Sequence, residues 1–193
     1  MPAPKILVFS SSTRTGSHNT KLAALAAKEL TLADVDVTRI SLVDYPLPIY
    51  DPDLDARAGQ PANALRLKQM IMAHHGVFIA SAEYSASVTP ILKNAIDWVS
   101  RVREKGDPTY AAFKNRVFAV SAASVGPDGG LRSIMALRQI LELGCGALVI
   151  PEVVSVANAD QAFDEMDNLV ETRTANRLRA QLDRLVEVTR LLM

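Results

Sequence analysis

The residues best suited to chemistry lie in one polar segment near the start of the chain, 10–20, which reads SSSTRTGSHNT. Nearly all of its side chains are hydroxyls or amides, and Arg14 adds one guanidinium. An apolar run at 6–9 precedes the segment, and apolar residues with helical spacing follow it over 22–30. The segment is therefore expected to join a buried strand to the start of a helix. Unpaired N–H groups and a positive dipole end favour an anion at that point.

The donors of this segment match a phosphate monoester. Arg14 offers a fork of N–H donors, and the hydroxyls add neutral ones. The sequence contains neither GxGxxG nor GxxxxGK[ST], so neither a dinucleotide fingerprint nor a P-loop is present. The terminal phosphate of FMN fits a hydroxyl-rich loop in this position. The same residue types also serve as turn and N-cap residues, which leaves a purely structural role open.

Length and composition restrict the possible classes of protein. The 193 residues predict a single domain over 1–193. Zero net charge and the lack of a basic stripe argue against a nucleic-acid partner. No apolar window reaches the roughly 18–20 residues of a membrane span, and no secretory signal is recognisable. Cys145 is the single cysteine, which excludes an internal disulfide, and it is expected to be a small packed residue. Together these features predict a cytoplasmic protein without a membrane partner.

Two other groups of polar residues do not predict a metal site. Segment 43–63 is rich in proline and is expected to be a loop. Its acidic run 51–55 resembles the first ligands of a calcium loop, but alanines stand where the turn glycine and the bidentate glutamate belong. His74 and His75 fall at a helix end, where the dipole favours imidazolium, and no further ligands are near them in the sequence. We therefore assign no metal.

Short apolar strands alternate with helical patterns along the chain. Strands are expected at 6–9, 35–42, 76–80, 116–120 and 147–150, with an extension to 153–154 as an alternative for the last. Helices are expected at 22–30, 61–75, 90–103, 131–144 and 168–192. Thr89 is the expected N-cap before Pro90. This alternation predicts an α/β fold with a doubly wound, five-stranded parallel sheet covered by helices on both faces.

Three of the turns that follow these strands are unusually polar or glycine-rich, namely 10–20, 81–89 and 121–130. In a parallel sheet the carboxyl ends of the strands share one edge, and ligands bind there near the point where the strand order reverses. We therefore expect the three turns to form a single site.

Three stretches of the chain resemble the NADPH-dependent FMN reductases of flavodoxin-like fold, which include quinone, azo-dye and chromate reductases. They are 12–19, then 83–85 together with 92–98, then 124–132 together with 137–138. The middle one, EYS followed by LKNAIDW, is the most specific, because the family pattern there reads roughly PEYN…PGxLKNAIDW. The resemblance covers almost the whole chain and implies a flavodoxin-like domain that binds FMN and NADPH.

The resemblance also implies a set of cofactor-binding residues. The phosphate-loop positions of the family correspond to Ser12, Arg14, Ser17 and Asn19, with Thr13 contributing its backbone. The turn that meets the isoalloxazine edge, including the N5 side, corresponds to Glu83, Tyr84 and Ser85. The third loop, at the pyrimidine end of the ring, corresponds to Ser124 and Gly126. Tyr84 is a candidate stacking wall or proton donor, and a loop aromatic that covers the core remains an alternative.

The sequence departs from the family pattern at several positions. Ser11 stands where glycine is common, Ala82 replaces proline, Ser85 replaces asparagine, and Thr89-Pro90 replaces Pro-Gly. Three arginines are candidates for the phosphate of NADPH: Arg101, Arg103 and Arg132.

Hydride transfer is the chemistry of the cofactor, so no catalytic side chain is required, in agreement with the lack of a GxSxG elbow. The expected function is a ping-pong reductase that passes hydride from NADPH through FMN to a quinone-like, azo or free-flavin acceptor. A flavodoxin-like electron carrier and a non-catalytic phosphate- or FMN-binding module remain alternatives. The helices at 90–103 and 131–144 carry apolar residues on more than one face, which predicts a homodimer or homotetramer.

Overall fold

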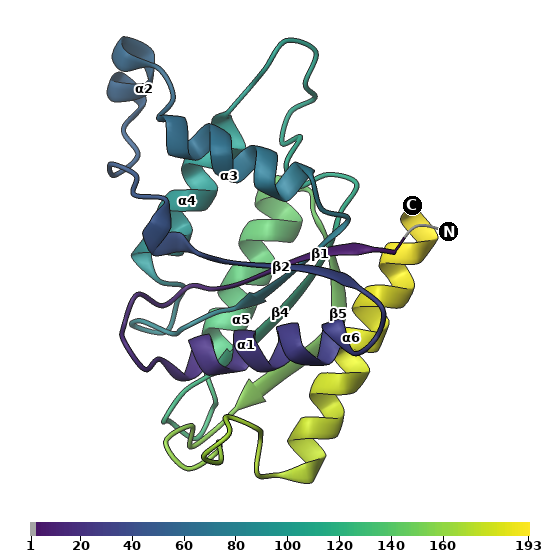
Figure 1. Cartoon of the computed structure of the whole chain (residues 1–193). Coiled ribbons are helices and arrows are strands. Elements are labelled where there is room, and N and C mark those ends of the chain that lie inside the picture. Colours follow the sequence, from purple (N-terminus) through teal and green to yellow (C-terminus); the bar gives the residue numbers. More distant parts are fainter. Residues whose placement is uncertain (1–2) are drawn as a thin grey trace.

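A twisted sheet of five parallel strands lies at the centre of the computed structural model, which describes residues 3–193 (Figure 1). The strands are β1 (Lys5–Ser10), β2 (Asp36–Ser41), β3 (Gly76–Ala80), β4 (Val117–Ala123) and β5 (Leu148–Val156), in the spatial order β2-β1-β3-β4-β5. The three inner strands are buried along nearly their whole length, whereas β2 is an edge strand without a fully buried residue. The predicted doubly wound parallel sheet is confirmed.

Helices cover both faces of this sheet. The helical segments of the chain are α1 (His18–Thr31), η1 (Leu42–Asp44), α2 (Pro52–Ala58), α3 (Ala62–Met72), α4 (Pro90–Arg101), α5 (Leu131–Gln139), η2 (Ile140–Gly144) and α6 (Thr172–Leu192). Of these, α2 has no buried residue and does not cover the sheet. Alternate strand residues point to opposite faces. Ile6 and Val8 pack with α1 and α6, while Leu7 and Phe9 pack with α3, α4 and α5. The uninterrupted apolar strands therefore contribute side chains to two separate cores, one on each face of the sheet.

Segment 43–63 is not the continuous loop that its prolines predicted, because it contains the end of η1 and the whole of α2. The Asp51 carboxylate caps α2 by accepting hydrogen bonds from the N–H groups of Asp53 (2.8 Å) and Leu54 (3.4 Å). Pro52 occupies the first helical position. An Asp N-cap, a proline at the first position and acids in the first turn are typical helix-start signals. The acidic run is thus a capping sequence.

Several predicted boundaries also move. The last helix begins at Thr172 instead of 168, and the helix predicted over 131–144 changes at Ile140 into a π-helical turn. Strand β5 continues through Pro151 to Val156, with a shift of register against β4 between Phe118 and Val120. A proline is tolerated there because β5 is an edge strand and can lose a ladder N–H.

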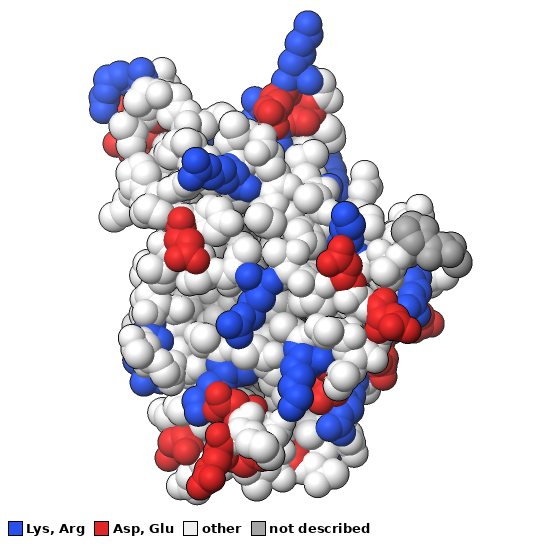
Figure 2. All heavy atoms as spheres, viewed as in Figure 1, with Lys and Arg blue, Asp and Glu red and all other residues white. Residues whose placement is uncertain are grey.

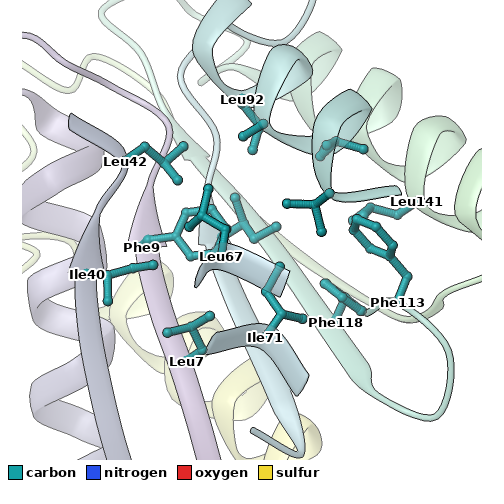
Figure 3. Close-up of a pocket in the computed structure, with 14 residues that line it drawn as sticks. Leu7, Phe9, Ile40, Leu42, Leu67, Ile71, Leu92, Phe113, Phe118 and Leu141 are labelled. Atoms are coloured by element: carbon teal, nitrogen blue, oxygen red, sulfur yellow. The ribbon is translucent and has the colours of Figure 1, made fainter. Parts of the chain in front are cut away.

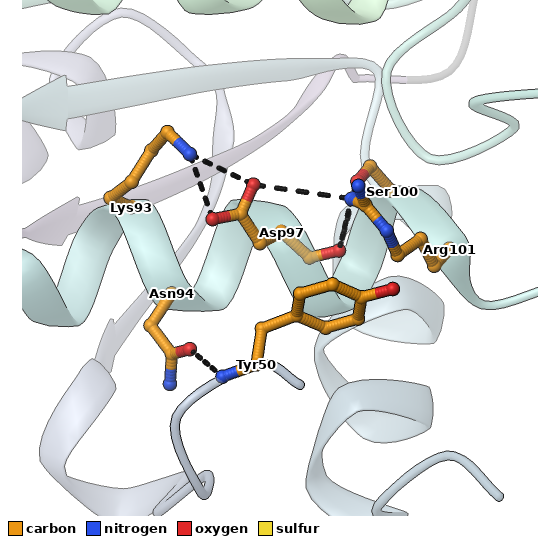
Figure 4. A network of polar contacts seen from close by, with 6 residues as sticks. All are labelled: Tyr50, Lys93, Asn94, Asp97, Ser100 and Arg101. Carbon is orange, nitrogen blue, oxygen red and sulfur yellow. Dashed lines mark hydrogen bonds and ion pairs between the residues drawn. The ribbon is translucent and has the colours of Figure 1, made fainter. Parts of the chain in front are cut away.

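The LKNAIDW stretch fastens the segment after β2 onto α4 (Figure 4). The Asn94 side chain accepts a hydrogen bond from the Tyr50 N–H (2.7 Å) and donates one to the Pro48 carbonyl (2.9 Å). Trp98 Nε1 donates to the same carbonyl (2.7 Å), and its ring meets the Tyr50 ring edge-on at 5.0 Å. The Arg101 guanidinium lies 4.3 Å from the centre of the Tyr50 ring. The most specific part of the sequence pattern therefore has a structural role, because it holds the segment after β2 against α4.

A small apolar cavity of about 30 Å³ lies in the core between the sheet and α3 and α4 (Figure 3). Its lining includes Phe9, Leu67, Leu92, Phe113 and Phe118. A cavity of this size could hold a water molecule, but the apolar lining offers no partner for its hydrogen bonds. The cavity belongs to the packing of the core and not to the polar edge described below.

Candidate functional site

The three polar loops predicted to converge do lie together, at the carboxyl ends of the adjacent strands β1, β3 and β4 (Figure 1). They comprise residues 11–17, 81–89 and 124–130. A hydrogen bond between Ser11 and Ala82 joins the first two loops directly. The elements that flank the loops are joined as well, since Asn19 of α1 bonds Ala123 of β4 and Glu83 bonds Ser133 of α5. The site is thus a composite of segments far apart in the sequence, as a parallel sheet requires.

The first loop presents hydroxyl groups whose protons remain available. Ser10 and Ser12 accept hydrogen bonds from the N–H groups of Ser12 (3.1 Å) and Arg14 (3.3 Å). Ser17 is the N-cap of α1 and accepts one from the N–H of Asn19 (3.2 Å). Each hydroxyl uses a lone pair inside the loop and keeps its O–H to donate. Exposed Arg14 makes no side-chain hydrogen bond or ion pair within residues 3–193, so the loop offers mainly donors.

The electrostatic environment of this loop also favours an anion. His18, the first residue of α1, stacks on Phe163 with ring centres 6.3 Å apart. Burial, followed by the charges of Arg14 and Lys21, lowers the pKa of His18 against the opposing effect of Asp160. Lys21 pairs with Asp167, so the charge of Arg14 and the α1 dipole are what favour an anion at this end of the helix.

Asn19 connects the start of α1, directly after the first loop, to the end of β4, directly before the third. Its side chain is buried, and it donates from Nδ2 to the Ala123 carbonyl (2.8 Å) while Oδ1 accepts from the Ala123 N–H (2.9 Å). The side chain thus pairs with the backbone at the end of β4. The resemblance implied a contact with phosphate, whereas this geometry gives Asn19 a positioning role between α1 and β4.

Ser11 connects the first loop to the second. Its Oγ accepts a hydrogen bond from the Ala82 N–H (2.8 Å), and its carbonyl accepts one from the Thr89 hydroxyl (2.8 Å). All three residues are buried. They are also three of the positions at which the chain departs from the family pattern. Alanine at 82 has an N–H that proline lacks, and serine at 11 supplies the acceptor that glycine lacks, so these two departures compensate each other.

Glu83 connects the second loop to the start of α5. One carboxylate oxygen accepts from Arg132 Nε (2.9 Å) and Nη2 (2.8 Å), and the other accepts from the Ser133 N–H (3.2 Å). The residue at the N-cap of α5, Gly130, has no side chain to cap the helix. The Glu83 carboxylate fills that role from another loop and interacts favourably with the helix dipole.

The second loop contains a strained turn. Tyr84 and Ser87 exchange two backbone hydrogen bonds of 3.0 Å, and the central residues Ser85 and Ala86 have φ values of 48° and 61°. Two positive φ angles characterise a type I′ turn, which favours Asn-Gly. The asparagine that is usual at 85 in the family therefore suits the backbone conformation. Tyr84 is 49% exposed, so it does not cover the core. Stacking on a ligand and proton donation stay as the candidate roles of its side chain.

The glycines of the third loop differ in whether the surrounding protein requires a residue without a side chain. Gly129 and Gly130 have positive φ, and an added Cβ would lie 2.8 Å or less from neighbouring atoms. At Gly126 an added Cβ would meet only the Ser124 Oγ, at 3.8 Å. Ser124 Oγ accepts from the Gly126 N–H (3.3 Å). Nothing in the surrounding protein therefore requires glycine at 126, which fits the close approach of a ligand.

Other kinds of site have less support. On the face shown in Figure 2, basic and acidic side chains are interspersed. Among residues 3–193 no three His, Cys, Asp or Glu side chains form a possible metal site, and no helix of that range has the length and apolar character of a membrane span.

The two histidines at the end of α3 contact the backbone of the protein. His74 Nδ1 lies 2.6 Å from the Met70 carbonyl, and His75 Nδ1 accepts from the Lys5 N–H (3.0 Å). Burial raises the pKa of Cys145 to about 11, so its thiol stays protonated near neutral pH.

Comparisons with known proteins found similar sequences and a similar fold. A family model described as NADPH-dependent FMN reductase matches residues 4–161. An NAD(P)H-dependent FMN reductase of Pseudomonas aeruginosa is 33% identical over 94% of this chain and 92% of its own. A quinone reductase of Escherichia coli is 30% identical over 92% of this chain and 91% of its own. The solved structure of FerB, an NAD(P)H:(acceptor) oxidoreductase of Paracoccus denitrificans, superposes with a TM-score of 0.77 at 28% identity and covers 98% of both chains.

The pairing of Ser11 with Ala82 predicts a measurable coupling. Ser11→Gly should cost about 1–3 kcal/mol of unfolding free energy, because it leaves a buried N–H without an acceptor. Ala82→Pro removes that N–H and should restore much of the loss, so a double-mutant cycle in urea should give a coupling of about 1 kcal/mol. Ser12→Gly combined with Ala82→Pro is the control pair and should be additive. Additive effects in the Ser11 pair would contradict the assignment.

The strained turn predicts that the protein gains stability from residues suited to positive φ. Ser85→Asn and Ala86→Gly should each raise the free energy of unfolding by about 1 kcal/mol, because they relieve left-handed backbone strain. Ser87→Gly, in the same turn but without a positive φ, is the control and should give no gain. Equal effects of all three substitutions in thermal unfolding would show that the turn is not strained.

Proposed function

The chain belongs to the NADPH-dependent FMN reductase family, and from this premise we propose that it passes hydride from NADPH to a quinone-like, azo or free-flavin acceptor in a ping-pong cycle. Membership in the family makes it an oxidoreductase that uses FMN and NAD(P)H. When bound, FMN supplies a centre at N5 that takes up and releases hydride. The protein must therefore hold the cofactor and leave one face open to two successive partners. We take the chain 1–193 as one FMN-binding domain.

The observation that carries the proposal is the donor-rich first loop at the start of α1. We assign the FMN phosphate to the hydroxyls of Ser12 and Ser17, the backbone of Thr13 and the guanidinium of Arg14. Within residues 3–193 the two hydroxyls act as hydrogen-bond acceptors and keep their protons, and the guanidinium has no hydrogen-bond or ion-pair partner. A dianion here also meets the positive end of α1. Asn19 holds this arrangement in place through Ala123.

The other two loops are assigned to the flavin ring. In this proposal the backbone groups of Glu83 and Ser85 and the side chain of Tyr84 would face its N5 edge, because the Tyr84 N–H is donated to Ser87. Ser124 and Gly126 would face its pyrimidine end. The Ser124 hydroxyl accepts from the Gly126 N–H and keeps its own proton, so it could donate toward the negative charge of a reduced ring at the pyrimidine end. The hydrogen bonds of Ser11 and Glu83 hold the second loop in place before any ligand arrives, so little reorganisation is needed.

The proposal includes a homodimer or homotetramer. The apolar residues of α4 are largely covered by the chain itself, as Trp98 and Val99 show, so α4 gives little support. The outer face of α5 and η2 supports an oligomer, since Leu131, Met135 and Leu143 are 40%, 63% and 82% exposed. Apolar side chains gathered on one helix favour burial against a second subunit. We place the enzyme in the cytoplasm, where a lone thiol stays reduced.

The function is tested by adding FMN and then NADPH under anaerobic conditions. The protein should bind FMN, NADPH should bleach the yellow absorbance, and a quinone added after removal of NADP⁺ should restore it. Rapid binding without bleaching would indicate an electron carrier, and no FMN binding would leave only a non-catalytic module. Gly126→Val is the matched variant. It should weaken FMN binding about tenfold or more, roughly 1.4 kcal/mol, without changing the melting temperature of the FMN-free protein.

A further inference from the structure

A second polar hollow lies beside the phosphate loop, between the carboxyl end of the edge strand β2 and the first turns of α1. Its volume is about 310 Å³. From the β2 side it is lined by Arg39, Ser41, Asp44 and Tyr45, and from the other side by Ser10, Ser12 and Thr20. Because Ser12 belongs to both, the hollow is continuous with the site assigned to the FMN phosphate. None of the functional assignments above uses its β2 side.

The hollow offers mainly hydrogen-bond donors. Ser10, Ser12 and Ser41 each accept a hydrogen bond from a backbone N–H two residues on, at 3.1–3.3 Å, which leaves their protons to donate. The Arg39 side chain is exposed and makes no hydrogen bond or ion pair within the described part of the chain. An unpaired guanidinium among hydroxyl donors is suited to a phosphate group. The one carboxylate, that of Asp44, can accept from a sugar hydroxyl.

Two of the arginines suggested by the sequence are already engaged elsewhere. Arg132 pairs with Glu83 and lies 3.6 Å from Asp128, and Arg101 covers the Tyr50 ring. Arg14 is assigned to FMN. Arg103 follows the C-terminal end of α4, at the opposite edge of the sheet from the carboxyl ends of the strands. Arg39 therefore remains as an available guanidinium at the edge where the cofactor site lies.

We propose that this hollow receives the phosphorylated adenosine ribose of NADPH, with Arg39 pairing with the 2′-phosphate. The inference rests on the proposed function and names the residues that distinguish NADPH from NADH. The hydride must be delivered near the loops after β3 and β4, and three strand spacings, roughly 14 Å, separate β4 from β2. An extended dinucleotide spans such a distance along the carboxyl edge of a sheet, and an arginine commonly receives the 2′-phosphate of NADP.

The test compares the two nucleotides on Arg39→Gln, which removes the charge and keeps much of the side-chain length. The KM for NADPH should rise about tenfold, and the KM for NADH and the Kd for FMN should stay unchanged. Arg57→Gln, an exposed arginine of α2, is the matched control and should change none of these. Calorimetric titration of the FMN-loaded protein with adenosine 2′,5′-bisphosphate should show weaker binding to Arg39→Gln, with 5′-AMP as the reference ligand.

Two other outcomes of the kinetic test overturn the inference. Equal KM values for NADPH in the variant and wild type would show that Arg39 does not contact the 2′-phosphate. A weaker Kd for FMN with an unchanged preference between NADPH and NADH would assign the hollow to the FMN phosphate. If wild type oxidises neither nucleotide, the proposed function fails. The bisphosphate titration then still decides this inference, since equal binding to both proteins would refute it.

Discussion

The structure of the site depends on the pair of hydrogen bonds between the Asn19 side chain and the Ala123 backbone. These bonds join the start of α1, where a phosphate would bind, to the end of β4, where the flavin ring would lie. Both partners are buried. Without the amide, the N–H and C=O groups of Ala123 would be left unsatisfied, at a cost of about 1–3 kcal/mol for each group. The pair therefore fixes the distance between two halves of the site.

The remaining braces follow the same principle, since each uses a side chain of one loop to satisfy backbone groups of another. Ser11 holds Ala82, Thr89 holds Ser11, and Glu83 holds the N-terminus of α5. The loops are thus held in place without a ligand. Such preorganisation lowers the entropy that binding costs and suits an enzyme whose protein part mainly positions a cofactor.

Much of this arrangement was predictable from the sequence, and the reasons are physical. Uninterrupted apolar runs such as 76–80 predict strands buried on both faces, and parallel strands bring their polar ends to one edge. The roles of Asn19 and Glu83 as braces were not predictable, because their partners are 104 and 50 residues away in the sequence. The positive φ of Ala86 was not predictable either, because an alanine in the sequence does not indicate a left-handed backbone.

The most direct test of the account is the affinity of Asn19→Ala for riboflavin, which lacks the phosphate, measured beside its affinity for FMN. If Asn19 positions the loops, both affinities should fall about tenfold or more, because the ring site shifts along with the phosphate site. Asn19→Asp, which can still accept from the Ala123 N–H, should fall in between. A loss for FMN alone would make Asn19 a simple phosphate ligand, and unchanged affinity for both flavins would contradict the account.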